Sequence, residues 1–144
     1  MILLVDDDAD DEALILRSLA KSKISESMVV ARDGVEALDY LFGTGTRAEQ
    51  GPLKPALVLL DLKLPKVDGL QVLERIRADE RTKCQPVVIL TSSDEEADLM
   101  RSYELGVNSY VRKPVDFAAF SKAITEIGLY WLLLSESPPE AMCR

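Results

Sequence analysis

The chain has 144 residues, of which 47% are hydrophobic and 29% are charged, and its formal net charge is −8. The length suits one domain and the composition a globular chain, which excludes a disordered protein, while the acidic balance argues against a nucleic-acid partner. The chain has no histidine, which excludes a histidine-dependent catalytic triad and a phosphohistidine of its own.

The apolar runs near the two ends of the chain are too short for a secretory leader or a membrane span. We therefore expect no membrane partner and a cytoplasmic location. The two cysteines, Cys84 and Cys143, have a spacing that fits neither a metal site nor a redox pair, and we expect both to be reduced.

Apolar runs and helix-like stretches alternate along the chain. In chain order we expect a strand at Ile2–Val5, a helix over 10–21, a strand at Met28–Ala31, a helix over 33–42, a long loop over 43–55, a strand at 56–60, a helix over 68–78, a strand at 87–90, a helix over 93–105, a strand at 109–113 and a helix over 116–134. The three most apolar runs do not alternate with polar residues, which is typical of strands covered on both faces of a parallel sheet. The order of elements predicts an α/β fold with a doubly wound, five-stranded parallel sheet.

Two helix ends carry specific signals. Ser93, followed by three acids, predicts the start of a helix, and Gly106 predicts its end. The last helix ends in 129–134, which is apolar on all sides, whereas a surface helix is apolar on one side. This end either packs beneath the domain or forms a homodimer, and the sequence leaves both open. We expect one domain over 1–134 and a C-terminal tail over 135–144.

Polar side chains follow four of the predicted strands at their carboxyl ends. Asp6 follows the first strand and Asp61 the third; Thr91 and Ser92 follow the fourth, and Lys113 ends the fifth. In a parallel sheet these ends lie along one edge, where doubly wound folds bind ligands. Carboxylates brought together need cations, which Lys113 and a hard divalent ion such as Mg²⁺ would supply. An aspartate in that setting can attack phosphorus, although each feature taken singly is more typical of a helix cap or turn.

Four stretches resemble the receiver domain of two-component response regulators. They are LLVDDD, VLLDLKLPKVDG, VVILTSSDEE and YELGVNSYVRKPVD, and the resemblance covers residues 2 to 134. It implies a flavodoxin-like sheet with strand order 2-1-3-4-5 and helices on both faces. The implied function is that of a single-domain response regulator, which takes a phosphoryl group from a sensor histidine kinase and relays the signal by a conformational switch.

The resemblance also implies roles for individual residues. Asp61 is the implied phosphoacceptor, Lys113 its pairing cation, and Thr91 the hydroxyl that closes on the phosphoryl group. Tyr110 resembles the aromatic switch that turns inward when this hydroxyl moves. The Lys113–Pro114 peptide bond is implied to be cis.

The implied cofactor is Mg²⁺, which Mn²⁺ or Ca²⁺ can replace in vitro. Its implied ligands are the carboxylate of Asp7, which binds directly, that of Asp6, which acts largely through water, that of Asp61, and the backbone carbonyl of Lys63. We expect the remaining acids of this stretch to be solvated residues at the start of the first helix: Asp8, Asp10 and Asp11.

The loop 43–55 and the final LYWLLL resemble a narrower group of regulators that are paired with phytochrome-type histidine kinases. A kinase of this type is therefore an expected partner, and a histidine phosphotransfer protein is a further one. The resemblance implies a signalling module with intrinsic autodephosphorylation rather than an enzyme.

Two alternatives differ in chemistry. A Mg²⁺-dependent phosphatase of the haloacid-dehalogenase type also uses an aspartate nucleophile, but carries it on the first strand in a DxDx(T/V) pattern. Here Asp6 and Asp8 are followed by Ala9 and Asp10, and the chain is short for a cap and a substrate pocket. An unphosphorylated structural relative of receivers is disfavoured by the complete set of acids, hydroxyl and lysine.

Overall fold

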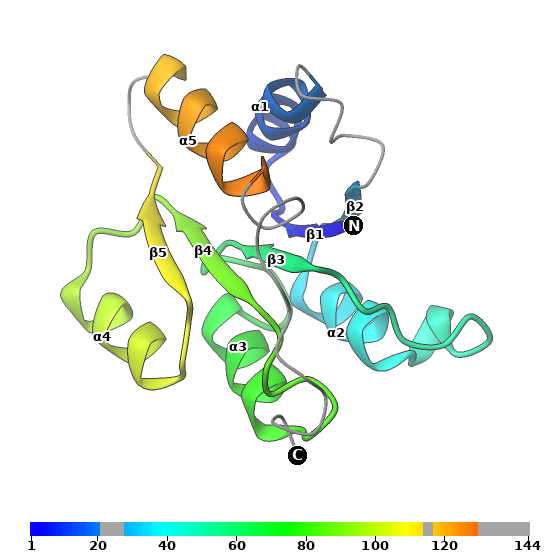
Figure 1. Cartoon of the computed structure of the whole chain (residues 1–144). Coiled ribbons are helices and arrows are strands. Elements are labelled where there is room, and N and C mark those ends of the chain that lie inside the picture. Colours follow the sequence, from blue (N-terminus) through cyan, green and yellow to red (C-terminus); the bar gives the residue numbers. More distant parts are fainter. Residues whose placement is uncertain (21–27, 114–116, 130–144) are drawn as a thin grey trace.

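The computed structural model of the chain describes residues 1–20, 28–113 and 117–129. Five strands in these residues form one parallel sheet in the order β2-β1-β3-β4-β5 (Figure 1). Their bounds are β1 (Ile2–Val5), β2 (Met28–Ala31), β3 (Leu57–Leu60), β4 (Val87–Thr91) and β5 (Ser109–Arg112). The predicted fold class and strand order are confirmed, and the three most apolar runs are the three central strands.

Helices cover both faces of the sheet. They are α1 (Ala9–Ala20), α2 (Gly34–Phe42), α3 (Gly69–Ala78), α4 (Glu96–Glu104) and α5 (Phe117–Leu129). Figure 1 shows α1 and α5 side by side on one face, and α2, α3 and α4 on the other. Successive strand residues point to opposite faces, so Leu3 and Val5 pack in the core beneath α2 and α3, while Ile2 and Leu4 pack in the core beneath α1 and α5. Burial on both faces explains why these runs lack polar alternation.

Aspartate side chains fix the start of two helices. Asp33 caps α2 by accepting a hydrogen bond from the Glu36 N–H at 2.8 Å. Asp68 and Gln71 form a reciprocal capping box at the start of α3. Both helices therefore begin within one residue of the predicted start, because an aspartate cap at a helix entry is a local signal.

The predicted start of α4 at Ser93 is wrong. The helix begins at Glu96, and its N-cap, Glu95, makes no side-chain capping bond. Ser93 is buried, and its hydroxyl donates to Asp98 Oδ2 at 2.7 Å instead of capping the helix. The chain between β4 and α4 is thus a loop over the carboxyl edge of the sheet.

The loop 43–55 folds back against its own start. Gly43 has a left-handed backbone (φ 67°), and a Cβ added there would lie 2.5 Å from the Pro52 nitrogen. The Leu53 N–H donates to the Tyr40 carbonyl at 2.7 Å, and a short 3-10 helix, η2 (Gly45–Arg47), lies between. The loop is therefore compact, and it connects the end of α2 to β3.

Several predictions lie outside the described residues: the Lys113–Pro114 bond, the apolar end over 130–134 and the tail over 135–144. The expectation of two reduced cysteines is not met, because Cys84 is disulfide-bonded in the structure. Among the described residues, none of the helices has the length and apolar character needed to cross a membrane.

Candidate functional site

The strand register brings the predicted side chains to one edge of the sheet. The Asp61 N–H donates to the Val5 carbonyl at 3.0 Å, so Asp6 and Asp61 leave paired strands side by side. The Lys113 N–H donates to the Thr91 carbonyl at 2.8 Å at the ends of β5 and β4. Acids, hydroxyl and amine therefore converge at the carboxyl edge, as predicted.

Lys113 is the centre of this site. Its Nζ lies 2.9 Å from Asp6 Oδ2, 2.7 Å from Asp11 Oδ2 and 3.0 Å from Asp61 Oδ2. The lysine side chain is only 11% exposed. An ammonium has three N–H donors, so these three carboxylates satisfy all of them.

An acid cluster surrounds the same point. Single carboxylate oxygens of Asp6, Asp7 and Asp61 all lie within 4.8 Å of one another, with Asp6 and Asp61 buried and Asp7 exposed. Backbone donors orient the buried acids: the Asp8 N–H bonds to Asp6 Oδ1 at 2.9 Å, and the Lys63 N–H bonds to Asp61 Oδ1 at 3.3 Å. Carboxylates at this spacing, open to solvent on one side, are the donor set that a hard divalent cation prefers.

The charges of the site affect one another. Burial raises the pKa of Asp6 to about 6, although the Asp8 N–H and the ammonium of Lys113 both act to lower it. Burial alone would lower the pKa of Lys113, but the hydrogen bond with Asp11 and the charges of Asp6 and Asp61 outweigh burial and raise it. Lys113 is therefore held as a cation, and one lysine does not fully compensate the buried acids.

The predicted switch residues meet at Ser93. Thr91 is completely buried, and its Oγ1 accepts a hydrogen bond from the Ser93 N–H at 3.2 Å. The hydroxyl of half-buried Tyr110 donates to the Ser93 carbonyl at 3.3 Å, and burial raises the pKa of Tyr110. A single residue of the β4–α4 loop therefore connects the hydroxyl at the site to the aromatic ring on β5.

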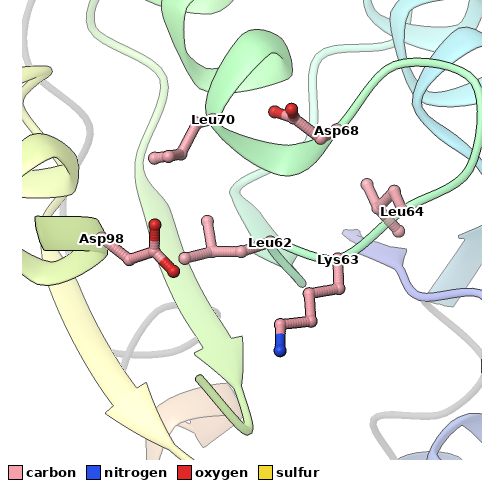
Figure 2. A pocket seen from close by; sticks show the side chains of 6 residues that line it. All are labelled: Leu62, Lys63, Leu64, Asp68, Leu70 and Asp98. Carbon is pink, nitrogen blue, oxygen red and sulfur yellow. The ribbon is translucent and has the colours of Figure 1, made fainter. Parts of the chain in front are cut away.

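An open pocket of about 420 Å³ lies beside the site, between the β3–α3 loop and α4 (Figure 2). Lys63 and Asp98 lie on its two sides, and in Figure 2 the side chain of Leu62 points toward Asp98. The Lys63 side chain is exposed and belongs to this lining, whereas its N–H bonds to Asp61. The full lining is Leu62, Lys63, Leu64, Asp68, Leu70 and Asp98.

One side chain that contacts the site lysine is missed by the sequence prediction. Asp8 and Asp10 are exposed acids at the start of α1, as expected, and Asp8 Oδ1 caps the helix by accepting from the N–H groups of Asp10 and Asp11 at 2.8 and 3.2 Å. Asp11 is different, because its carboxylate makes the shortest contact with Lys113. No local signal marks this contact, since the two residues are far apart in the chain.

The chain belongs to the response regulator receiver domain family, whose model matches residues 2–125. It is therefore a phosphoryl-accepting receiver of two-component signalling, as predicted, and the haloacid-dehalogenase alternative gains no support. Receivers of this family bind a divalent metal ion, and the cluster of Asp6, Asp7 and Asp61 fits one.

Several known response regulators are similar to this chain in sequence and in structure. The response regulator Rcp1 of Synechocystis sp. is 40% identical over 132 residues, which are 92% of this chain and 88% of Rcp1. The crystal structure of its Mn²⁺-bound form has a TM-score of 0.87 at 38% identity and covers 96% of this chain and 98% of that one. The phosphorylated cyanobacterial phytochrome response regulator RcpA has a TM-score of 0.87 at 39% identity, covering 96% and 97% of the two chains. The bacteriophytochrome response regulator AtBRR has a TM-score of 0.73 at 55% identity, covering 94% and 96%.

Proposed function

We propose that Asp61 accepts a phosphoryl group from a histidine of a sensor kinase. A carboxylate oxygen of Asp61 attacks phosphorus, a P–O bond forms, and the P–N bond to the imidazole breaks. The observation that carries this proposal is the position of Asp61, which is both a member of the acid cluster and a partner of the Lys113 ammonium at 3.0 Å. The Lys63 N–H holds one oxygen of Asp61 and Lys113 the other, so the carboxylate is oriented at both oxygens.

The proposed metal ligands are the carboxylates of Asp6, Asp7 and Asp61 and the backbone carbonyl of Lys63. A divalent ion bound there supplies positive charge for the phosphoryl oxygens. The other roles belong to side chains of this protein. The acids orient the phosphoryl group, and the ammonium of Lys113 pairs with a phosphoryl oxygen while Lys113 stays bonded to Asp6.

We propose that Thr91 and Tyr110 form the switch. A phosphoryl group on Asp61 gives the Thr91 hydroxyl a new acceptor, and the bond between Thr91 Oγ1 and the Ser93 N–H links any movement to the β4–α4 loop. Tyr110 holds the carbonyl of the same residue, so the ring and the loop move together. Phosphorylation then favours one of two arrangements of this surface, which a partner can distinguish.

The names of two similar proteins, RcpA and AtBRR, support a phytochrome-type histidine kinase as the partner. A histidine phosphotransfer protein and a homodimer through the C-terminal helix stay predictions. Four further expectations stay predictions. They are intrinsic autodephosphorylation in place of enzyme turnover, the absence of nucleic-acid and membrane partners, the cytoplasmic location, and the division into a receiver over 1–134 and a tail over 135–144.

Phosphorylation by acetyl phosphate tests the role of Asp61. We expect the intact mass to gain one phosphoryl group in the presence of Mg²⁺, and the Asp61→Asn variant to gain none. The matched control is Asp10→Asn, which removes an exposed acid of the same stretch and should react like the wild type. A phosphoryl group that persists in Asp61→Asn would assign the acceptor elsewhere.

Transfer from purified kinases tests the partner. We expect a phosphorylated phytochrome-type kinase to transfer to this chain faster than kinases with other input domains, because kinases prefer their cognate receivers. Equal transfer rates from all kinases would remove the phytochrome pairing and leave the role of Asp61 intact.

A further inference from the structure

Asp11 lies outside the acid cluster but makes the closest contact with the site lysine. The distance from its Oδ2 to Lys113 Nζ is 2.7 Å, against 2.9 Å for Asp6 and 3.0 Å for Asp61. It also comes from a different element: Asp6 and Asp61 follow sheet strands, whereas Asp11 is in the first turn of α1. Lys113 is thus held between the sheet edge and a helix.

The three partners of Lys113 have different fates in the proposed reaction. Asp61 is the acceptor. After transfer, the Lys113 N–H that donates to Asp61 in this structure donates to a phosphoryl oxygen instead. Asp6 is a proposed metal ligand, so its negative charge is shared between the metal ion and the ammonium of Lys113. Asp11 is the one partner of the three that belongs neither to the acid cluster nor to the reacting group.

The carboxylate of Asp11 is also fixed in advance. Its own N–H donates to Asp8 Oδ1 at 3.2 Å, which orders the first turn of α1. Its side chain is 30% exposed, so solvent reaches it, but the positive end of the helix dipole favours its charge. It needs no rearrangement to receive the ammonium.

We propose that Asp11 is a positioning residue for phosphoryl transfer: it fixes the ammonium of Lys113 and touches neither metal ion nor phosphoryl group. The inference rests on the proposed roles of Asp61 and Lys113. With Asp11 present, the ammonium keeps two anchors when its bond to Asp61 passes to the phosphoryl group. Without Asp11 a single anchor remains, and that anchor is also a metal ligand.

The test compares Asp11→Ala and Asp11→Asn with the matched control Asp10→Ala, which removes an exposed acid of the same helical turn. Initial phosphorylation rates with acetyl phosphate are measured by intact mass at saturating Mg²⁺, and Mg²⁺ affinity by calorimetry. Because a hydrogen bond between charged groups is lost, we expect Asp11→Ala to react about tenfold more slowly. Its Mg²⁺ affinity should fall by less than its rate does, because Asp11 contacts Lys113 and does not belong to the acid cluster.

The asparagine variant distinguishes position from charge. It keeps an oxygen acceptor at the same place, so we expect a rate between those of the wild type and Asp11→Ala. Three results would overturn the proposal: Asp11→Ala as fast as Asp10→Ala, a fall in Mg²⁺ affinity as large as the fall in rate, or Asp11→Asn as slow as Asp11→Ala. A wild type that gains no phosphoryl group would refute the proposed function instead, so the two failures are distinguishable.

Discussion

Two partly buried cations, Lys113 and Arg77, lie at opposite edges of the sheet and have different surroundings. At the carboxyl edge, Lys113 bonds to three carboxylates. At the amino edge, Arg77 of α3 bonds to neutral acceptors, as far as the described residues show: the carbonyls of Gly106 and Gln85, and Asn108 Oδ1 at 3.3 Å. Acids raise the pKa of Lys113, whereas burial lowers that of Arg77.

The difference separates a reactive site from a structural one. The guanidinium of Arg77 is planar and rigid, and it ties the end of α3 to the turns that precede β4 and β5. An ammonium is a point charge whose donors rotate, so Lys113 can pass a hydrogen bond from one oxygen to another. The acids around it carry more negative charge than it neutralises, which leaves the site ready for a second cation.

Removing the charge of Lys113 should have the largest effect on stability. In metal-free protein we expect Lys113→Met to lower the free energy of unfolding by about 3–5 kcal/mol, because buried acids lose their counter-charge. Denaturant unfolding with and without Mg²⁺ measures this, and saturating Mg²⁺ should recover part of the loss. A loss below about 1 kcal/mol, the size found for exposed pairs, would show that the acids are solvated rather than paired.

Removing Arg77 should have a smaller effect that is independent of the metal. Arg77→Met leaves the carbonyls of Gly106 and Gln85 without their donor, which we expect to cost about 2–3 kcal/mol. The same unfolding experiment should give the same loss with and without Mg²⁺, and phosphorylation of the folded variant should stay near the wild-type rate. A Mg²⁺-dependent loss would mean that the two edges are coupled.

The sequence predicted the fold because its signals are local. Apolar runs without alternation identify β1, β3 and β4, and the predicted helices over 33–42 and 68–78 correspond to α2 and α3. The convergence of the site residues follows from topology: once the sheet is parallel, residues after its strands must share one edge. Their individual roles follow from the resemblance to receiver domains. That rule predicts that Asp6, Asp61 and Lys113 lie together, as they do.

Contacts between distant segments could not be predicted in the same way. Asp11 looks like any first-turn acid, and its role depends on how α1 lies beside the end of β5. Ser93 has the sequence of a helix cap, but its hydroxyl bonds to Asp98 because the chain first crosses the edge of the sheet. Arg77 is one of several charges on α3, and only packing shows that it reaches the turn at Gly106.

Replacing the guanidinium of Arg77 by an ammonium tests whether its shape, and not only its charge, stabilises the fold. We expect Arg77→Lys to lose about 1–2 kcal/mol of stability, because one ammonium cannot span the carbonyls of Gln85 and Gly106 as the planar fork does. The control is Arg75→Lys on the same helix, an exposed residue that should change stability by less than about 0.5 kcal/mol. Equal effects of the two changes would show that charge, rather than the shape of the guanidinium, matters at Arg77.

The exposed cation Lys66 should contribute least to stability among the cations compared. Lys66 lies 3.3 Å from Asp33 Oδ2, but its side chain is 65% exposed. We expect Lys66→Met to change stability by less than about 1 kcal/mol at low salt, and the difference to disappear in about 1 M salt. Paired denaturation curves at the two salt concentrations measure it.

The pH dependence of this exposed pair separates its two contributions. The Glu36 N–H, more than Lys66, lowers the pKa of Asp33, so the helix cap should still lower it in Lys66→Met. Because the folded pKa is lowered, the contribution of Asp33 is present above its unfolded value of about 4 and is lost as the pH falls through the folded value. Wild type and Lys66→Met should therefore differ near neutral pH and converge in acid. A difference that persists at low pH or at high salt would come from packing of the lysine stem, since an exposed charge pair survives neither condition.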